Sequence, residues 1–228
     1  MDDSIERGEV TVTAVVRPSS SEAKSILEAL PNVRVMVGDL RDPAFVDSCV
    51  AGQDIVMSCL GNLTSGIGYW NKPVRFSAGH VHLHKTNPQH PKTVKSEPEY
   101  LEICTKNIIA AMKKHGVKKA NVISASGVGD SYRKTSWILR VMLKTTALAH
   151  LYPYLETMES LYDAESELDV CINRPTKLTF GPLTGKGKVV EDTFGYRVIS
   201  RADVAKWMLD ESLKDGVFQV KKPLLADS

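Results

Sequence analysis

The sequence lacks the features that define several large classes of protein. Its cysteines lie far apart and form no Cys-x-x-Cys pair, which argues against a zinc site or disulfides and favours buried thiols: they are Cys49, Cys59, Cys104 and Cys171. No apolar run approaches the ~20 residues of a membrane span, and the acidic N-terminus lacks the apolar segment of a secretory signal. The net charge of +2 is too small to indicate nucleic-acid binding. We expect a cytoplasmic protein with neither nucleic acid nor membrane as a partner.

Apolar runs typical of strands alternate with helical patterns along the chain. Continuous apolar strands separated by helices indicate a parallel sheet covered on both faces. We therefore predict an α/β fold with a Rossmann-like, doubly wound parallel sheet in a single domain, residues 1–228, interrupted by an irregular inserted loop at 63–98. The predicted strands are 10–16, 33–39, 54–61, 119–127 and 168–175, and the predicted helices are 21–31, 42–52, 99–116, 153–165 and 200–213.

Polar residues follow the first two predicted strands, at the end where such sheets bind ligands. Arg17 would pair with the 2′-phosphate of NADP, with Ser19 and Ser20 as further donors. The alternative is an exposed charge at a strand end, followed by a helix cap. Asp39, preceded by Gly38, would accept a hydrogen bond from an adenine amino group, or is a loop carboxylate satisfied by backbone.

Seven sequence blocks, in the same order along the chain, resemble those of the biliverdin IXβ reductase/flavin reductase family. The members of that family are atypical short-chain dehydrogenases related to NmrA-like proteins. The blocks are VVRPSS, VGDLRD, VAGQDIV, CLGN, NIIAAMKKHGVKK, GPLTG and RVISRADVAKWML. The resemblance implies a Rossmann fold that uses NADPH to reduce flavins or linear tetrapyrroles by hydride transfer. An alternative of another class is a non-catalytic NmrA-like module that binds dinucleotide and regulates a partner.

The resemblance also assigns roles to individual residues. It implies that Ser124 and Ser126 flank the family's nicotinamide serine, whose position is occupied by Ala125, and that Lys177 stands where the family has a histidine beside the substrate. Lys177 would stabilise negative charge on the acceptor, or is a solvated loop lysine. The catalytic candidates are Ser124, Ser126 and Lys177. The cofactor-binding candidates are Arg17, Ser19, Ser20, Gly38, Asp39, Leu40, Leu60, Gly61, Ser124 and Thr176.

Two other motifs are incomplete. None of the seven tyrosines has a lysine four residues later, so the Tyr-x-x-x-Lys pair of alcohol dehydrogenation is absent. GPLTGKGK at 181–188 is one residue too short for a phosphate-binding P-loop and lacks its Ser/Thr, so we predict an ordinary loop.

The inserted loop carries alternating histidines. His80, His82 and His84 would share one face of an extended backbone and, with His90, form a zinc or nickel site. No carboxylate or cysteine lies nearby to complete the site, and several prolines mark a loop. We favour a surface insertion without metal.

The expected sheet lacks its first strand. In the strand order 3-2-1-4-5-6, that strand would lie between the segments at 10–16 and 54–61, followed by the glycine-rich turn that holds the pyrophosphate. Residues 1–8, MDDSIERG, resemble the end of the helix after that turn. We therefore expect the Rossmann domain to be incomplete at its N-terminus.

Overall fold

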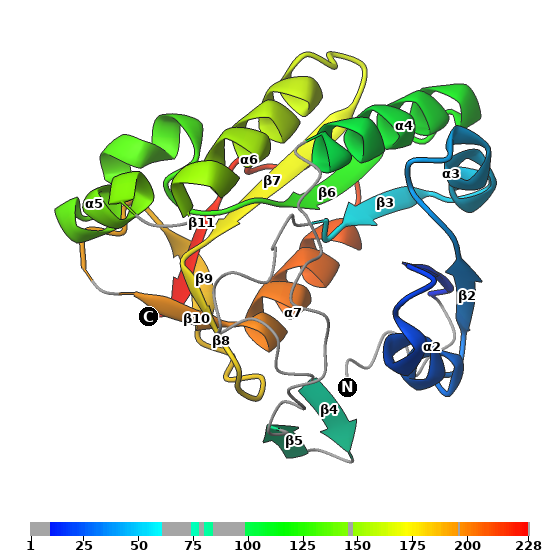
Figure 1. Cartoon of the computed structure of the whole chain (residues 1–228), viewed down its shortest axis with the longest axis horizontal. Helices are drawn as coiled ribbons and strands as arrows, with labels where there is room; N and C mark the ends of the chain where they lie inside the picture. Colours follow the sequence, from blue (N-terminus) through cyan, green and yellow to red (C-terminus); the bar gives the residue numbers. More distant parts are fainter. Residues whose placement is uncertain are drawn as a thin grey trace. The chain divides into compact units, whose positions relative to one another are not determined.

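A computed structural model describes residues 10–60, 74–77, 80–83, 99–145, 148–195 and 197–227 (Figure 1). Contacts divide the chain into two compact units. Unit 1 comprises residues 1–53 and 103–117, and unit 2 comprises residues 54–102 and 118–228.

Unit 1 contains two parallel strands, β1 (Val12–Val16) and β2 (Val33–Val37), connected by helix α2 (Ser21–Glu28). Val16 lies opposite Val37, so both strands end at the same edge. The strands are rich in valine, which favours extended backbone. This strand–helix–strand segment was predicted, although no side chain of α2 is fully buried.

Two further helices complete unit 1 in the described part of the chain. Helix α3 (Pro43–Val50) begins with Pro43, and the Asp42 carboxylate accepts a hydrogen bond from the Ala44 N–H at 3.0 Å. Helix α4 (Tyr100–His115) follows the insertion, belongs to unit 1 from Ile103 onward and ends where the sequence predicted. Its apolar stripe is buried: Leu101, Cys104, Ile108 and Met112.

Unit 2 contains a five-stranded sheet in the order β3-β6-β7-β11-β9. The first four strands pair in parallel and β9 is antiparallel to β11, an edge strand that the sequence analysis did not predict. A second, parallel pair joins β8 (Lys177–Thr179) to β10 (Val198–Ser200). The strands of the larger sheet are β3 (Ile55–Ser58), β6 (Lys119–Ile123), β7 (Asp169–Pro175), β9 (Gly187–Val190) and β11 (Leu224–Asp227).

Helices α6 (Leu148–Asp163) and α7 (Arg201–Ser212) lie on opposite sides of β6 and β7 (Figure 1). Helix α7 begins as predicted, because the Ser200 hydroxyl accepts a hydrogen bond from the Asp203 N–H at 3.0 Å. Helix α6 starts five residues before the predicted boundary at 153 and carries Pro153 inside it. Helix α5 (Trp137–Thr145) and the 3₁₀ turn η1 (Gly129–Lys134) were not predicted.

Part of the predicted insertion forms a hairpin rather than an irregular loop. Strand β4 (Val74–Ser77) pairs antiparallel with β5 (His80–Leu83), so His80 and His82 lie two positions apart in one strand. His84, His90 and Gly61 lie outside the described residues. Among the described residues, no group of histidine, cysteine and carboxylate side chains is arranged to hold a metal ion.

The cysteines of the described segments are unpaired, and three of the four are buried. Cys59 is exposed, which corrects the expectation of uniformly buried thiols: it lies just past the end of β3. In the same segments, β1 pairs with β2 alone and β3 with β6 alone, so the two strands predicted to flank a missing one belong to different sheets. No described helix is long and apolar enough to cross a membrane.

Candidate functional site

The predicted adenosine-side residues of unit 1 meet at the carboxyl edge of β1 and β2. Arg17 follows Val16 directly and is exposed, while the Gly38 N–H donates to the Val16 carbonyl at 3.1 Å. Parallel pairing therefore places Arg17 beside Gly38 and Asp39. Gly38 is needed there for close packing, because a Cβ at this position would lie 2.5 Å from the ring of Phe45.

The N-cap of α2, Ser20, lies three residues after Arg17. Ser20 is the N-cap of this helix, yet its side chain makes no capping hydrogen bond to the described backbone. The Ser20 hydroxyl is thus not used as a helix cap. Ser19, next to it, is exposed.

Asp39 is bound by a second arginine. Its carboxylate accepts from the Arg41 side chain at 2.5–3.1 Å and from the Arg41 N–H at 2.9 Å. These hydrogen bonds hold the pKa of Asp39 below its ordinary value. The Asn107 amide of α4 donates to the carbonyls of Leu40 and Arg41 at 2.9 and 3.1 Å, which fixes this loop.

The predicted nicotinamide-side residues of unit 2 extend the ladder between β6 and β7. The Ser124 N–H donates to the Asn173 carbonyl at 2.7 Å, and the Ser126 N–H donates to the Pro175 carbonyl at 3.0 Å. The Thr176 N–H donates to the Leu225 carbonyl at 2.9 Å. The structure therefore brings Ser124, Ser126 and Thr176 together at the carboxyl ends of adjacent strands, all three buried.

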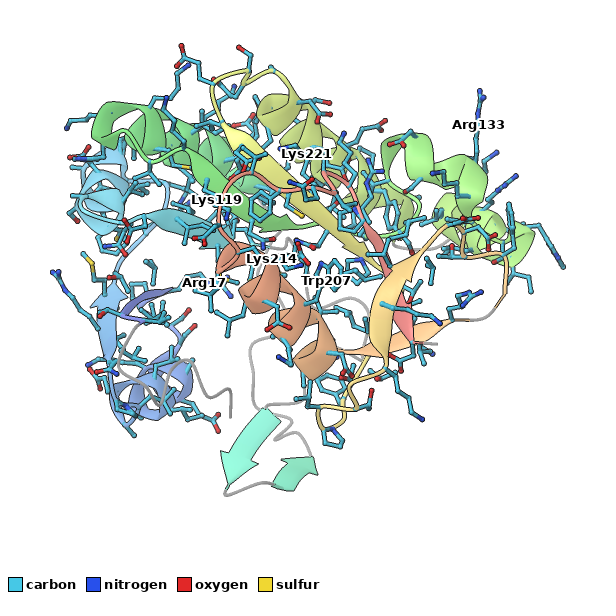
Figure 2. The ribbon with its side chains drawn as sticks, turned by 180° about the vertical axis from the view of Figure 1, so that it is seen from behind. Arg17, Lys119, Arg133, Trp207, Lys214 and Lys221 are labelled. Atoms are coloured by element: carbon cyan, nitrogen blue, oxygen red, sulfur yellow. The ribbon has the colours of Figure 1, made fainter. Side chains whose placement is uncertain are left out.

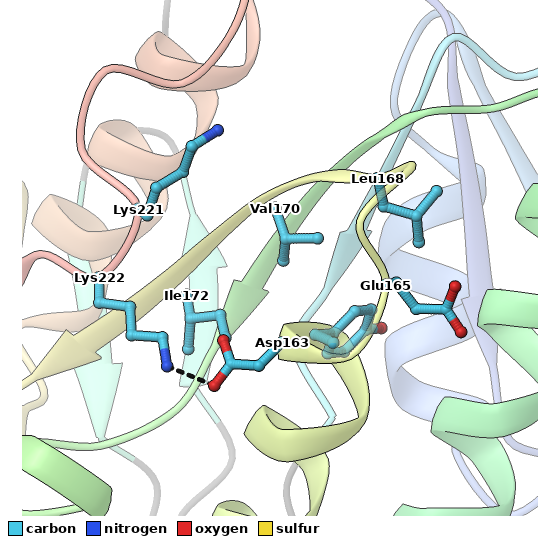
Figure 3. Close-up of a pocket in the computed structure, with 8 residues that line it drawn as sticks. Asp163, Glu165, Leu168, Val170, Ile172, Lys221 and Lys222 are labelled. Atoms are coloured by element: carbon cyan, nitrogen blue, oxygen red, sulfur yellow. Dashed lines mark hydrogen bonds and ion pairs between the residues drawn. The ribbon is translucent and has the colours of Figure 1, made fainter.

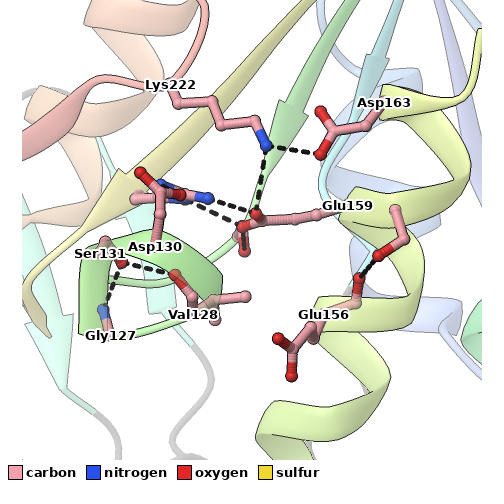
Figure 4. A network of polar contacts seen from close by, with 11 residues as sticks. Gly127, Val128, Asp130, Ser131, Glu156, Glu159, Asp163 and Lys222 are labelled. Carbon is pink, nitrogen blue, oxygen red and sulfur yellow. Dashed lines mark hydrogen bonds and ion pairs between the residues drawn. The ribbon is translucent and has the colours of Figure 1, made fainter. Parts of the chain in front are cut away.

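One of these hydroxyl groups, that of Ser124, is hydrogen-bonded to a buried ion network (Figure 4). Arg174, 2% exposed, donates to both carboxylate oxygens of Glu159 at 3.1 and 2.5 Å and contacts Asp130 at 2.8 Å. The Ser124 hydroxyl donates to the same Glu159 carboxylate at 2.5 Å. Burial alone would lower the pKa of Arg174, but Glu159 and Asp130 outweigh it and hold the pKa above its ordinary value. The guanidinium therefore stays charged.

The turn after β6 is fixed by glycine and by a serine. Gly127 has φ +93°, and a Cβ there would lie 2.9 Å from Cδ1 of Leu143 in α5. The Gly127 N–H donates to the Ser131 hydroxyl at 2.9 Å, and that hydroxyl donates to the Val128 carbonyl at 2.7 Å (Figure 4). Backbone donors near the strand end are thus held in one arrangement.

Two residues of this edge differ in their polar contacts. The Thr176 hydroxyl oxygen is buried without a hydrogen-bond partner among the described residues. Such a group carries a desolvation cost unless a ligand satisfies it. Lys177, the next residue, is exposed at the start of β8.

The Tyr152 hydroxyl donates to the Ser126 carbonyl at 2.9 Å, and burial raises the pKa of Tyr152.

A concavity of about 160 Å³ lies at the opposite ends of the strands (Figure 3). It is lined in part by Val170 and Ile172 of β7 and by Lys222, which precedes β11. Lys222 pairs with Asp163 at 2.6 Å. Because parallel sheets bind ligands at their carboxyl ends, this concavity is separate from the candidate site.

Glu159 was not among the predicted site residues, although the sequence carried a signal for it. Glu159 lies on α6 among Leu155, Met158 and Tyr162, all buried, so the sequence places one acid on an apolar helical face. A buried acid of this kind requires a partner. Arg174 is that partner, but its identity depends on the pairing of β7 with its neighbours, which the pattern alone does not give.

The fold is that of a Rossmann-type α/β protein, and the predicted cofactor residues that the structure describes follow the carboxyl ends of its parallel strands. The model of the NAD(P)H-binding family matches residues 2–215, and the chain belongs to that family.

Several solved structures share the fold. The anaerobillin reductase ChuY of Escherichia coli O157:H7 is 18% identical, with a TM-score of 0.67 over 97% of this chain and 86% of that one. A short-chain dehydrogenase/reductase of Veillonella parvula in complex with NADP is 14% identical, with a TM-score of 0.64 over 94% and 82%. A Rossmann-fold NAD(P)-binding family protein of Shigella flexneri is 16% identical, with a TM-score of 0.54 over 95% and 93%.

Proposed function

We propose that the protein is an NADPH-dependent reductase that transfers hydride to a flat conjugated acceptor, a flavin or a linear tetrapyrrole. The observation that carries the proposal is the unpartnered Thr176 hydroxyl, buried beside Ser124 and Ser126 at the carboxyl ends of β6 and β7. Membership of the NAD(P)H-binding family supports it. The acceptor class is suggested by the sequence blocks and by the fold shared with an anaerobillin reductase.

The residues present fit a phosphorylated dinucleotide. In unit 1, the exposed guanidinium of Arg17 and the uncommitted hydroxyl of Ser20 would hold the 2′-phosphate. Asp39, Leu40 and the loop fixed by Asn107 would contact the adenine. In unit 2, Leu60 and Thr176 would contact the cofactor.

When bound, the nicotinamide supplies the hydride. The contribution of the chain is orientation and electrostatics. The Ser124 hydroxyl already donates a hydrogen bond to Glu159. Its role would therefore be to fix the strand end rather than to protonate the acceptor. Ser126 would orient the nicotinamide amide or the acceptor. Lys177 would flank the acceptor and stabilise negative charge that develops on it.

Thr176→Val tests the carrying observation. Because the hydroxyl has no partner in the described protein, its removal is expected to leave the free energy of unfolding unchanged or slightly higher. The Kd for NADPH, measured by calorimetry, is expected to rise about two- to tenfold, the value of one hydrogen bond. Thr179→Val is the matched control, since that hydroxyl donates to the Ile199 carbonyl: it should lower stability and leave the Kd unchanged. An unchanged Kd in Thr176→Val contradicts the assignment.

Arg17→Ala tests the choice of cofactor. Loss of a charge-assisted phosphate contact is expected to weaken NADPH binding about ten- to a hundredfold and to leave NADH binding nearly unchanged. Arg34→Ala, an exposed arginine on the adjacent strand β2, is the control and should change neither. Equal losses for both nucleotides in Arg17→Ala would refute the 2′-phosphate role.

A second candidate is a dinucleotide-binding regulatory module without catalysis. It is favoured by the commitment of the Ser124 hydroxyl to Glu159 and by the absence of a Tyr-x-x-x-Lys pair from the sequence. NADPH consumption with FMN and with biliverdin separates the two. Tight NADPH binding without consumption would favour the regulatory module.

A further inference from the structure

Helix α5 carries apolar side chains on two faces. Leu143 is buried and approaches Gly127, which anchors the inner face of the helix within unit 2. On the other face Trp137, Ile138 and Val141 are 73%, 55% and 49% exposed. At 100° per residue these three side chains fall within one sector of the helix, so they form a continuous surface, here called the α5 face. Contiguous exposed apolar groups mark an interaction site.

The surroundings of the α5 face are cationic. Between Asp130 and Glu156 the sequence has four lysine and arginine residues and no acid. Arg133, Lys134 and Lys144 are exposed, and none forms an ion pair with a described carboxylate. Arg133 extends away from the ribbon (Figure 2). Arg140, in contrast, is bound to the protein itself. It donates to the Arg133 carbonyl at 2.6 Å and lies over the Tyr132 ring.

An apolar face surrounded by cations is suited to few kinds of partner. A second copy docked face to face through α5 would bring these like charges together, which costs energy without compensation. A nucleic acid would pair with the cations but would leave Ile138 and Val141 in water. An anionic lipid surface satisfies both groups, because apolar side chains enter the acyl boundary while lysine and arginine remain at the headgroups.

We propose that the α5 face docks the protein on the surface of an anionic phospholipid membrane. Trp137, Ile138 and Val141 enter the interface, and Arg133, Lys134 and Lys144 contact the headgroups. The expectation of no membrane partner rested on the lack of a spanning segment, and a helix that lies in the interface needs none. This docking is independent of the reductase proposal.

The test is cosedimentation of the full chain with vesicles of phosphatidylcholine, with and without phosphatidylserine. We expect binding only to vesicles that contain phosphatidylserine. Replacing Trp137, Ile138 and Val141 together by serine should weaken binding about tenfold or more. Reversing Arg133, Lys134 and Lys144 to glutamate should weaken it about fivefold or more for each cation.

Matched controls change the same chemistry elsewhere on unit 2. Val217→Ser with Val220→Ser alters exposed apolar residues, and Lys118→Glu, Lys186→Glu and Lys188→Glu make the same change of net charge. Both controls should keep wild-type binding. Circular dichroism melting identifies any variant that fails to fold. In that case Trp137→Ser replaces the serine variant, and Lys134→Glu replaces the glutamate variant.

A second readout uses vesicles that contain brominated acyl chains, which quench tryptophan fluorescence on contact. Quenching should occur in the wild type and fall in Trp137→Phe. Several outcomes would overturn the proposal: no binding to either vesicle, equal loss in the controls, a dimer without lipid that the serine variant abolishes, or binding to a short nucleic acid in place of vesicles.

Discussion

The predicted cofactor residues of the two units have different surroundings. In unit 1, Arg17 and Ser19 are exposed, and Asp39 is held by its near neighbour Arg41. In unit 2, Ser124 and Thr176 are buried, and Ser124 is bonded to a network that joins three separate elements. Substitutions at the exposed residues of unit 1 should therefore change folding stability little, whereas substitutions that break the Ser124–Glu159–Arg174 network of unit 2 should lower it.

The largest effect is expected from Glu159→Ala. The substitution removes the main partner of the buried Arg174, and breaking a buried pair costs about 3–5 kcal/mol. Urea unfolding followed by circular dichroism measures the loss. Glu156→Ala is the control, because Glu156 is exposed one turn earlier on the same helix and should change stability by less than about 0.5 kcal/mol. Similar losses in both variants would contradict the special role of the network.

An intermediate effect is expected from Asp203→Asn, also in unit 2. Burial alone would raise the pKa of Asp203, but hydrogen bonds from Ser200, Thr184 and the Gly185 N–H outweigh it and lower the pKa from 3.8. A lowered pKa in the folded state contributes stability that is complete above the unfolded value of 3.8 and is lost as the pH falls below it.

The asparagine variant should therefore lose about 1.5–3 kcal/mol at neutral pH and show a flatter decline of stability in acid. Unfolding by urea across acidic pH values measures both. Asp210→Asn, an exposed residue of the same helix paired with Lys206, should keep the wild-type profile. A wild-type acid profile in Asp203→Asn would show that this carboxylate does not carry the dependence.

The smallest effect is expected from Asp39→Asn in unit 1. Exposed ion pairs contribute about 0–1 kcal/mol, and salt screens them further. A double-mutant cycle with Arg41→Gln measures the pair directly. A coupling well above this range would remove the contrast between the two units.

The sequence was sufficient for the parts of the fold that depend on local pattern. The extent of α4, the start of α7 at Ser200 and the parallel pairing of β1 with β2 agree with the prediction, because apolar period and capping residues act over a few positions. The predicted loop at 181–188 agrees only in part, because Gly187 and Lys188 begin strand β9. The N–H groups of Thr184 and Gly185 within it bind the Asp203 carboxylate.

Features that depend on distant partners were missed. Strand β9 has little apolar pattern of its own and exists through its pairing with β11. Helix α5 is amphipathic, with Arg140 and Lys144 on its polar side, but it was not predicted from the sequence. The contacts of Glu159 with Ser124, 35 positions away, and with Arg174, 15 away, likewise require the folded sheet.

Gly127 affects how mutational scans of this protein should be interpreted. Any other residue there would need a left-handed backbone and would meet Leu143 at 2.9 Å. A scan that scored activity alone would rank this position with the reacting groups, although glycine has no functional group to offer. Measuring protein abundance alongside turnover would distinguish a variant that fails to fold from one that folds but does not react. The buried candidate residues Ser124, Ser126 and Thr176 need the same paired measurement.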